Sequence, residues 1–441
     1  MKTPNAELRV KVESQRTLLP GMYGGIDFTI RPERFTVDPD AVTMMRRQLA
    51  DSRPRLLADH DEVSRIEAYT MMGDQLCDAY AALIPELGFK HLVAMLMAAC
   101  DHGVDSVEDA PPQLVALIRE MERVPDWIDM DLVRRGARLE RNGVVNTMPF
   151  TVRGAFLATF INKYAALPMA STGALSEKKA ARRVKETAAF SAVSAMPGSL
   201  EPGGAAFKTA AMVRLMHSMV RFNLLRKGNW DATVYGVPIP QSDQMPAGMA
   251  GVFFTSMKLL AKGRTEFTPE QRASAEFARY RCHLLGLPQD LLPTTPQAVV
   301  DVMATRHATL LRAWDDSTCG ALVRSTMATY LAPDETWRSR VRNTFERSFS
   351  KFFFIKVFLD GDKKRAADVG IPLTFADYPR AAVLGTAVGV KAISYRVASK
   401  IPGVSELADR RLVAKLTRLL DQLGHGEYTT DASTYRAEAH A

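Results

Sequence analysis

The sequence is short of the features that define several protein classes. Its 441 residues include four cysteines, Cys77, Cys100, Cys282 and Cys319, which are far apart and form no Cys-x-x-Cys pair. This spacing argues against a disulfide framework and against a structural zinc site. Only eight histidines are present, and none has the His-x-x-x-His or Glu-x-x-His spacing of a metal site.

Long apolar runs are missing as well. No run of about 18 or more consecutive apolar residues occurs, so we do not expect a membrane-spanning helix. The opening segment, MKTPNAELRVKVESQR, lacks the apolar core and the small-residue cleavage site of a secretory signal. Together these absences predict a cytoplasmic protein.

Positive charge is in moderate excess, with 57 Lys and Arg against 49 Asp and Glu and a net charge of +8. The positive residues are scattered and accompany no nucleic-acid-binding motif, so we predict no nucleic-acid partner. Hydrophobic residues make up 47% and charged residues 24%, which is typical of a soluble globular protein that buries a substantial core.

Helix start and stop signals dominate the chain. Thr268 is the expected N-cap of a helix with Pro269 in its first turn, Gln271 completing a capping box and Gly286 just past its end. A second Thr-Pro pair opens another helix at residue 295. Apolar residues spaced three and four apart predict further helices over residues 61–84, 88–101, 111–123, 130–141, 151–166, 176–193, 206–227, 335–358, 381–399 and 404–423.

Strand signals are weak. Residues 26–30 and 232–240 could form short extended pieces, and the prolines of the second make it a poor central strand. No Pro/Gly/Ser-rich linker divides the interior. We therefore predict an all-α protein with minor short β pieces: an N-terminal extension (residues 1–30), a single large helical domain (residues 31–423) and a flexible C-terminal tail (residues 424–441).

Two helical segments carry the polar residues of most interest. In ARRVKETAAF, residues 181–190, the three- and four-residue spacing places Arg183, Glu186 and Thr187 on one face. In AMVRLMHSMVRFN, residues 211–223, His217 lies among valines and methionines with Arg214 and Arg221 near it. A neutral imidazole in apolar surroundings is a good metal ligand, and the two arginines could hold carboxylates. Equally, His217 could be a core histidine and Arg183–Glu186 an ordinary helical ion pair.

A family resemblance bears on this choice. The chain resembles the latex clearing protein (rubber oxygenase) family and the related MpaB-type oxygenases. The family's Arg-x-x-Lys-Thr on a helix, followed about thirty residues later by a histidine, is matched by RVKET and then His217. NWDATVYGVPIPQSDQMPAGMAGVFF looks like its Gly-x-Pro-Ile-x-Gln-x-Asp stretch, and YRCHLLGLPQDLLPTTP like its Leu-Gly-Ile/Leu-Pro segment. Together with VPDWID and KYAALPMASTGAL, these motifs span roughly residues 120–300.

The resemblance implies a helical fold with a globin-like core and added helices, and one non-covalently bound haem b. It makes His217 the proximal iron ligand, with Arg214 and Arg221 as partners of the haem propionates. Arg183 and Thr187 correspond to the family's polar residues on the distal side. The family's distal lysine falls on Glu186, while Lys185 is one position early and would face elsewhere.

The predicted function is a haem b-dependent oxidoreductase that oxygenates or oxidatively cleaves an unsaturated hydrophobic, isoprenoid- or lipid-like substrate with dioxygen or peroxide. Arg183, Glu186 and Thr187 would then be the catalytic residues. A haem peroxidase or peroxygenase is an alternative, because Glu186 as a distal acid/base, or as a second iron ligand, suits O–O cleavage. A non-catalytic haem sensor or carrier, and a haem-free helical binding protein, are further alternatives.

The predicted partners are a small hydrophobic substrate and dioxygen or peroxide, while the oligomeric state stays open. Weak association with a membrane surface is a further hypothesis. It rests on RSFSKFFFIKVFLDGDKKR, which starts at residue 347 and interleaves aromatic with basic residues. Packing of these aromatics in the core is the alternative interpretation.

Overall fold

The predicted start signals of two helices are confirmed in the computed structural model, which describes residues 5–173 and 177–424. Helix α16 (Pro269–Leu284) starts with the full capping box, in which Thr268 Oγ1 accepts from the Gln271 N–H and Gln271 Oε1 accepts from the Thr268 N–H. Helix α17 (Pro296–Thr309) starts at its Thr-Pro pair, where Thr295 Oγ1 accepts from the Ala298 N–H. These signals are local, so the sequence alone suffices to place them.

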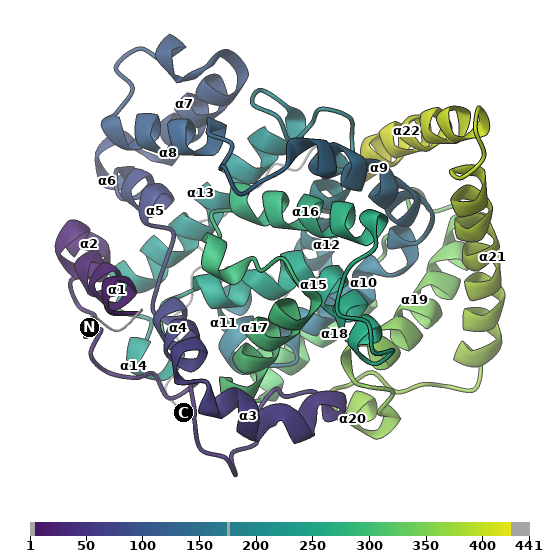
Figure 1. Ribbon diagram of the computed structural model, residues 1–441, viewed down its shortest axis with the longest axis horizontal. Coiled ribbons are helices and arrows are strands. Elements are labelled where there is room, and N and C mark those ends of the chain that lie inside the picture. Colours follow the sequence, from purple (N-terminus) through teal and green to yellow (C-terminus); the bar gives the residue numbers. More distant parts are fainter. Residues whose placement is uncertain (1–4, 174–176, 425–441) are drawn as a thin grey trace. The chain divides into compact units, whose positions relative to one another are not determined.

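The chain divides into two compact units, each formed by segments that are distant in the sequence. Within the described chain, unit 1 comprises residues 5–136 and 198–312, and unit 2 comprises residues 137–173, 177–197 and 313–424. Helix α9 (Met130–Asn146), labelled in Figure 1, contains residues assigned to both units. The domain limits expected at residues 31 and 423 stay a prediction, and residues 425–441 of the expected tail lie outside the described residues.

Unit 1 is helical throughout its regular structure. Its α-helices, besides α16 and α17, are α1 (Ala6–Leu18), α2 (Pro20–Tyr23), α3 (Arg53–Ala58), α4 (His60–Thr70), α5 (Gln75–Ala81), α6 (Ile84–Leu87), α7 (Phe89–His102), α8 (Pro112–Glu122), α13 (Ala205–Arg226), α14 (Ala232–Tyr235) and α15 (Gln241–Leu260). The short turns η1 (Arg47–Ser52), η2 (Val104–Ser106) and η5 (Gln289–Leu291) connect some of them.

Unit 2 is built in the same manner from fewer helices. They are α10 (Val152–Leu157), α11 (Lys163–Ser171), α12 (Glu177–Ser194), α18 (Ala321–Ala328), α19 (Trp337–Phe358), α20 (Lys363–Asp368), α21 (Asp377–Ala398) and α22 (Val404–Leu423). Its short helical turns are η3 (Met148–Phe150), η4 (Ala158–Phe160) and the π-type turn η6 (Asp316–Gly320).

The all-α class is confirmed, but the short strands were predicted in the wrong places. Over the described residues, β pairing is limited to the isolated bridges Phe35–Leu310 and Thr43–Leu311. Residues 232–235 instead form α14, which Asp231 caps by accepting from the Thr233 N–H. The helix predicted over 61–84 is broken between α4 and α5, where the chain turns at Gly73.

A large apolar cluster forms much of the core of unit 1. It draws on α1, α2, α4, α13, α15, α16 and α17 and includes Met245, Met249 and Phe253 of α15. These residues recur four apart on one face of α15, which is why that helix packs inward. Gly248 allows a close approach of α15 to α16, because a Cβ there would collide with the thiol of Cys282. All four cysteines are buried free thiols.

The core of unit 2 contains a buried ion pair. Arg153 of α10 is fully buried and donates from Nε and Nη2 to the Glu346 carboxylate of α19, at 3.1 and 2.7 Å. Its Nη1 donates to the carbonyls of Thr326 and Thr329 at the end of α18. One side chain therefore ties three helices together.

The aromatic segment that starts at residue 347 lies mainly on α19 and is partly packed into unit 2. Phe354 and Ile355 are buried, and Lys351 donates to Asp377 at 3.0 Å. This packing supports the core interpretation of that segment.

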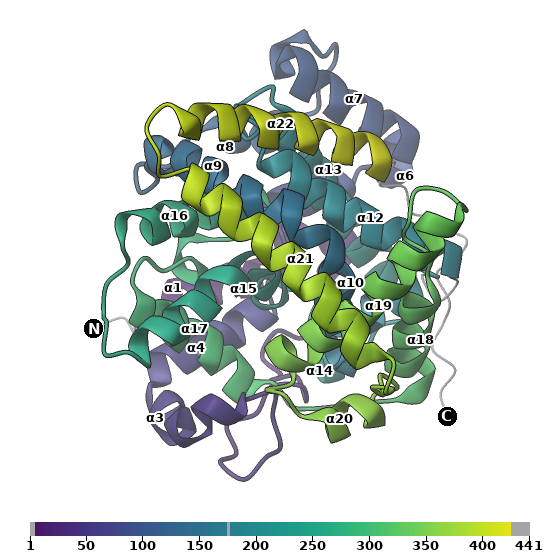
Figure 2. The same cartoon turned by 90° about the vertical axis from the view of Figure 1, so that its right-hand side faces the viewer.

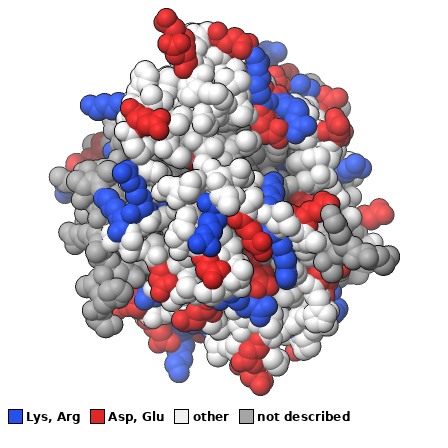
Figure 3. Space-filling model, turned by 90° about the vertical axis from the view of Figure 1, so that its left-hand side faces the viewer, with Lys and Arg blue, Asp and Glu red and all other residues white. Residues whose placement is uncertain are grey.

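On the molecular face drawn in Figure 3, basic and acidic side chains are interspersed.

We predict that Glu346→Gln destabilises unit 2 by about 3–5 kcal/mol, because it leaves the Arg153 charge buried without its counter-charge. Urea denaturation followed by circular dichroism measures this. Glu335→Gln is the control, since it removes a carboxylate from an exposed pair with Arg340 and should leave the unfolding midpoint unchanged. Equal midpoints for Glu346→Gln and the wild type would contradict the assigned role.

Candidate functional site

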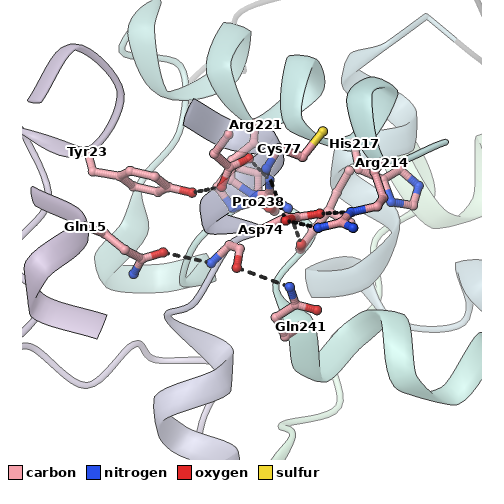
Figure 4. A network of polar contacts seen from close by, with 12 residues as sticks. Gln15, Tyr23, Asp74, Cys77, Arg214, His217, Arg221, Pro238 and Gln241 are labelled. Atoms are coloured by element: carbon pink, nitrogen blue, oxygen red, sulfur yellow. Dashed lines mark hydrogen bonds and ion pairs between the residues drawn. The ribbon is translucent and has the colours of Figure 1, made fainter. Parts of the chain in front are cut away.

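Helix α13 presents three of the predicted site residues on one face. Arg214, His217 and Arg221 are spaced three and four residues apart, and Figure 4 shows them projecting from the same helix. His217 is half-buried, with the buried apolar residues Met216 and Val220 beside it in the sequence. The structure thus confirms the shared face that the sequence predicts.

Both arginines are paired with buried carboxylates of unit 1. Arg214 donates from Nε and Nη2 to the two oxygens of Asp74, at 2.7 and 2.8 Å. Arg221 donates to Asp78, and also to the carbonyls of Pro238 and Ile239 at 2.9 and 2.8 Å. Two aspartates four residues apart at the start of α5 thus pair with two arginines seven residues apart on α13.

This cluster of two ion pairs tolerates only small residues around it. Gly73 lies where a Cβ would collide with the Tyr23 hydroxyl and the Asp78 carboxylate. Gly286 has a φ of +86°, and a Cβ there would lie 2.6 Å from Asp74 Oδ2. Glycine at these positions therefore follows from the ion pairs.

Burial and neighbouring charges shift the pKa values of several groups in the cluster. Burial, followed by the negative charge of Asp78, raises the pKa of the Tyr23 phenol, which therefore stays protonated and donates to Asp78 Oδ2 at 2.6 Å. For Arg214, burial opposes the charged form, but the Asp74 carboxylate outweighs it and raises the pKa above the ordinary value. In the second pair, burial outweighs Arg221 and raises the pKa of the Asp78 carboxyl, while Asp78 outweighs burial and raises the pKa of the Arg221 guanidinium.

The propionate role predicted for Arg214 and Arg221 has no support in this geometry. Both guanidinium groups lie inside the fold, bonded to carboxylates of the chain itself. A haem propionate would have to displace Asp74 or Asp78, each of which would then be a buried unpaired charge. We therefore assign the two arginines a positioning role: they fix α13, and with it His217, against α5.

A chain of amide hydrogen bonds leads from the backbone to His217. Gln241 Nε2 donates to the carbonyl of Gly73 at 3.2 Å, and Gln244 Nε2 lies 3.5 Å from Gln241 Oε1. Gln244 Oε1 is 3.0 Å from His217 Nδ1. On the other side of the turn, Gln15 Oε1 accepts from the Gly73 N–H at 2.9 Å (Figure 4).

The direction of this chain follows from its backbone end. A carbonyl oxygen only accepts, so Gln241 must turn its NH₂ group toward Gly73 and its oxygen toward Gln244. Gln244 then donates to that oxygen and presents its own oxygen to His217. The imidazole must therefore carry its proton on Nδ1, which leaves the lone pair on Nε2. We call this series, Gly73–Gln241–Gln244–His217, the amide relay.

The amide relay fits an imidazole that ligates iron. Metal-ligating histidines commonly donate their second ring N–H to an acceptor that sets the tautomer and the ring orientation. Gln244 provides that acceptor here. A site built from several protein ligands is less well supported, because the described chain contains no group of three or more His, Cys, Asp or Glu side chains placed to hold a metal ion.

Helix α15, which carries both glutamines, is anchored at its first turn. Asp243 accepts from Arg34 at 2.7 and 2.9 Å and from Arg306 at 2.7 Å. Pro246 cannot donate to the carbonyl of Ser242, and Arg306 Nε donates to that carbonyl instead at 2.8 Å. The buried arginines thus stabilise a helix that its own proline would weaken.

The predicted distal residues belong to unit 2, where they form their own group on α12. Glu186 is buried and accepts from Arg182 at 2.9 Å and from Arg183 at 3.0 Å. Both oxygens of this carboxylate are therefore engaged by arginines of its own helix. Thr187 is exposed and donates to the carbonyl of Arg183. Lys185 lines a separate cavity of unit 2 with Glu346 and Leu419.

Residues 144–350, just under half the chain, match the model of the catalytic domain of "ER-bound oxygenase mpaB/B'/Rubber oxygenase". The rubber oxygenase of Streptomyces sp. (strain K30) is 24% identical over 188 residues. That alignment covers 42% of this chain and 46% of the relative, so the match spans less than half of that protein. The predicted resemblance to this oxygenase family is confirmed.

The fold agrees with a solved member of the family. The structure of latex clearing protein in the closed state superimposes with a TM-score of 0.54 at 18% identity, covering 79% of this chain and 91% of that one. The helical architecture is therefore shared. The family model covers His217, Arg183, Glu186 and Thr187, whose individual roles stay predictions.

The sequence analysis did not single out Gln241, Gln244, Asp74 and Asp78 as site residues. Gln241 lies in the stretch that resembles the family's Gly-x-Pro-Ile-x-Gln-x-Asp motif. The sequence did not show, however, that Gln241 is linked through Gln244 to His217. The paired spacing of acids on one helix and arginines on another was the available signal for the ion pairs. Which helices meet is a tertiary fact, and the sequence does not contain it in local form.

We predict that His217 of the haem-free protein carries its proton on Nδ1. Long-range ¹H–¹⁵N correlation spectra of histidine-labelled protein report this directly. Gln244→Glu keeps the acceptor and should keep the tautomer, whereas Gln244→Leu removes it and should shift the population toward Nε2–H. His283, which burial keeps neutral by lowering its pKa to about 4, is an internal control. An Nε2–H tautomer in the wild type would rule out the amide relay.

Acid should weaken the anchor of α15. Burial by itself raises the pKa of the Asp243 carboxyl, but Arg34 and Arg306 outweigh burial and hold that pKa below its ordinary value. This group therefore stabilises the fold above the ordinary carboxyl pKa of about 4, and the stabilisation is lost as the pH falls, because the unfolded chain binds the proton more tightly.

Accordingly, Asp243→Asn should lower the free energy of unfolding by about 3–5 kcal/mol at pH 7, and by clearly less at pH 3. Urea denaturation of both proteins at the two pH values measures the difference. A gap that is equal at both pH values would show that the Asp243 charge does not contribute.

Proposed function

We propose that this protein is a haem b-dependent oxygenase that acts on an unsaturated hydrophobic, isoprenoid- or lipid-like molecule, and that His217 would hold the haem iron. The amide relay is the observation that carries the proposal, because it places the ring proton of a half-buried imidazole on Nδ1 and the lone pair on Nε2. The match of residues 144–350 to an oxygenase catalytic domain supports the same function. Haem would supply dioxygen binding and activation.

The chain's own contributions follow from its contacts. The amide relay orients His217 and raises the basicity of Nε2, since the Nδ1 proton is shared with a carbonyl oxygen. The ion pairs of Arg214 and Arg221 hold α13 so that this orientation is preserved. Buried Met216 and Val220 make the surroundings of the imidazole apolar, which suits a neutral ligand and a hydrophobic substrate.

The overall reaction balances without an outside reductant. Cleavage of one carbon–carbon double bond by one dioxygen molecule gives two carbonyl groups, and each new carbonyl receives one oxygen atom. The double bond is oxidised and dioxygen is reduced. We propose this cleavage over a peroxidase reaction, because both carboxylate oxygens of Glu186 are already engaged by arginines of its own helix.

Haem binding is tested spectroscopically. Expressed with haem supply, the protein should show a Soret band that shifts on reduction with dithionite and again on carbon monoxide binding. His217→Ala should lose most of this absorbance, while His283→Ala, the replacement of another histidine of unit 1, should keep it. A Soret band of equal intensity in His217→Ala would contradict the ligand assignment.

Turnover is tested with squalene as a probe of the substrate class. Under ¹⁸O₂, carbonyl products labelled at both new oxygens are expected, and none under hydrogen peroxide without dioxygen. Products formed with peroxide alone would favour the peroxygenase alternative. A haem-loaded protein that binds dioxygen but gives no product would favour a sensor or carrier. Arg183→Ala and Thr187→Ala in the same assay test their predicted catalytic roles.

A further inference from the structure

We propose that α21, together with the bend that follows it, is a docking surface for a membrane containing anionic lipids. This inference does not depend on the proposed function. It concerns residues beyond the segment that matches the oxygenase model, which ends at residue 350. It also moves the hypothesis of membrane association from the segment that starts at residue 347 to a different helix.

The first observation is a stripe of exposed apolar side chains along α21. Val383, Val390 and Val397 are seven residues apart, and their side chains are 62%, 60% and 54% exposed. Ile393, at 58%, lies on the same side. Side chains seven apart lie two helical turns apart on one face, so these four form a continuous strip, which we call the apolar stripe.

The stripe continues past the end of the helix. Ile401 on the bend is exposed, as are Val404 and Leu407 in the first turn of α22 and Phe375 just before α21. Figure 2 shows α21 and α22 as two rods joined by this bend. Soluble monomers rarely expose apolar side chains in a contiguous run of this kind, and such runs mark interaction surfaces.

The second observation is the charge around the stripe. Between Tyr378 and Ser405 the chain has four basic residues, Arg380, Lys391, Arg396 and Lys400, and no Asp or Glu; the next acid, Glu406, pairs with Arg138 at 3.1 Å. At 100° per residue, Arg380 and Lys391 fall on one side of the stripe and Arg396 on the other. An apolar face edged by cations on both sides is complementary to acyl chains beneath anionic headgroups.

The same charges argue against a second copy of this chain as the occupant. Two stripes packed face to face would bring the basic edges of both copies together, and no acidic residue between 378 and 405 is present to compensate them. Like charges held opposite one another destabilise an interface. A membrane surface with negative headgroups has no such conflict.

The helix is placed to lie along the membrane plane. Its 22 residues make it long and apolar enough to span a bilayer by length and composition alone, the one such helix in the described chain. Its opposite face, however, packs within unit 2: Ala381 and Val388 are buried, and Gly385 lies against Phe349 of α19. Lys391 near its middle would also be costly at the centre of a bilayer.

Vesicle flotation of the full-length protein tests the proposal. The wild type should float with vesicles of phosphatidylcholine and phosphatidylserine, bind phosphatidylcholine alone more weakly, and lose the difference in high salt. Val390→Glu combined with Ile393→Glu should weaken binding by at least about tenfold, because two side chains no longer insert. Lys391→Glu combined with Arg396→Glu should abolish the preference for phosphatidylserine.

Val341→Glu is the matched control, because it places the same charge at another exposed valine, on α19 of the same unit. It should bind like the wild type, and urea denaturation should show that all variants are folded. The proposal is overturned if the wild type binds neither vesicle, or if the Val390/Ile393 double variant binds equally well. It is also overturned if sedimentation shows a dimer that this double variant dissociates, since a second copy then covers the stripe.

Discussion

The buried ion pairs between α13 and α5 are the interaction on which the candidate site depends. Arg214–Asp74 and Arg221–Asp78 lie on the same face of α13 as His217, one on each side of it. They hold the histidine helix in one register, because a slip of one residue would leave four charges buried without partners. Three further features follow from these pairs. Positions 73 and 286 require glycine, and Tyr23 stays protonated to donate to Asp78. Arg221 also donates to the carbonyls of Pro238 and Ile239.

The amide relay builds on this fixed frame. It begins at the backbone of Gly73, the residue whose lack of a side chain accommodates the Asp78–Arg221 pair. The position of His217 and the protonation of its ring are thus set by the same turn between α4 and α5. A rigid helix and a fixed tautomer are what an axial ligand requires, since both position and basicity control how strongly it binds iron. The turn between α4 and α5 therefore influences the position and the tautomer of His217 on α13.

Local signals in the sequence were enough for much of the fold. The capping box at Thr268 and Gln271, and the Thr-Pro start at residue 295, depend on neighbours within four residues and were placed correctly. Helix α15 was missed as a helix because Pro246, Gly248 and Gly251 lower its intrinsic propensity. It forms because Arg306 satisfies the Ser242 carbonyl and because its apolar face completes the core of unit 1. Such compensation comes from distant residues.

The candidate site divides along the same line. The helical period alone predicts two features of the site. One is the shared face of Arg214, His217 and Arg221, and the other is the Arg183–Glu186 pair. The propionate role of the two arginines was inferred without knowledge of Asp74 and Asp78, and the buried pairs remove its basis. Gln244 as the partner of His217 was not predicted, because it depends on how α15 packs against α13.

Resonance Raman spectroscopy of the reduced, haem-loaded protein is the most direct test of the central claim, that His217 ligates iron through Nε2 while Nδ1–H donates to Gln244. The account predicts an iron–histidine stretching band that is absent in His217→Ala. It further predicts that the band moves to lower frequency in Gln244→Leu, because loss of the acceptor makes the imidazole a weaker donor. A band that persists in His217→Ala, or that Gln244→Leu leaves unmoved, would contradict the account.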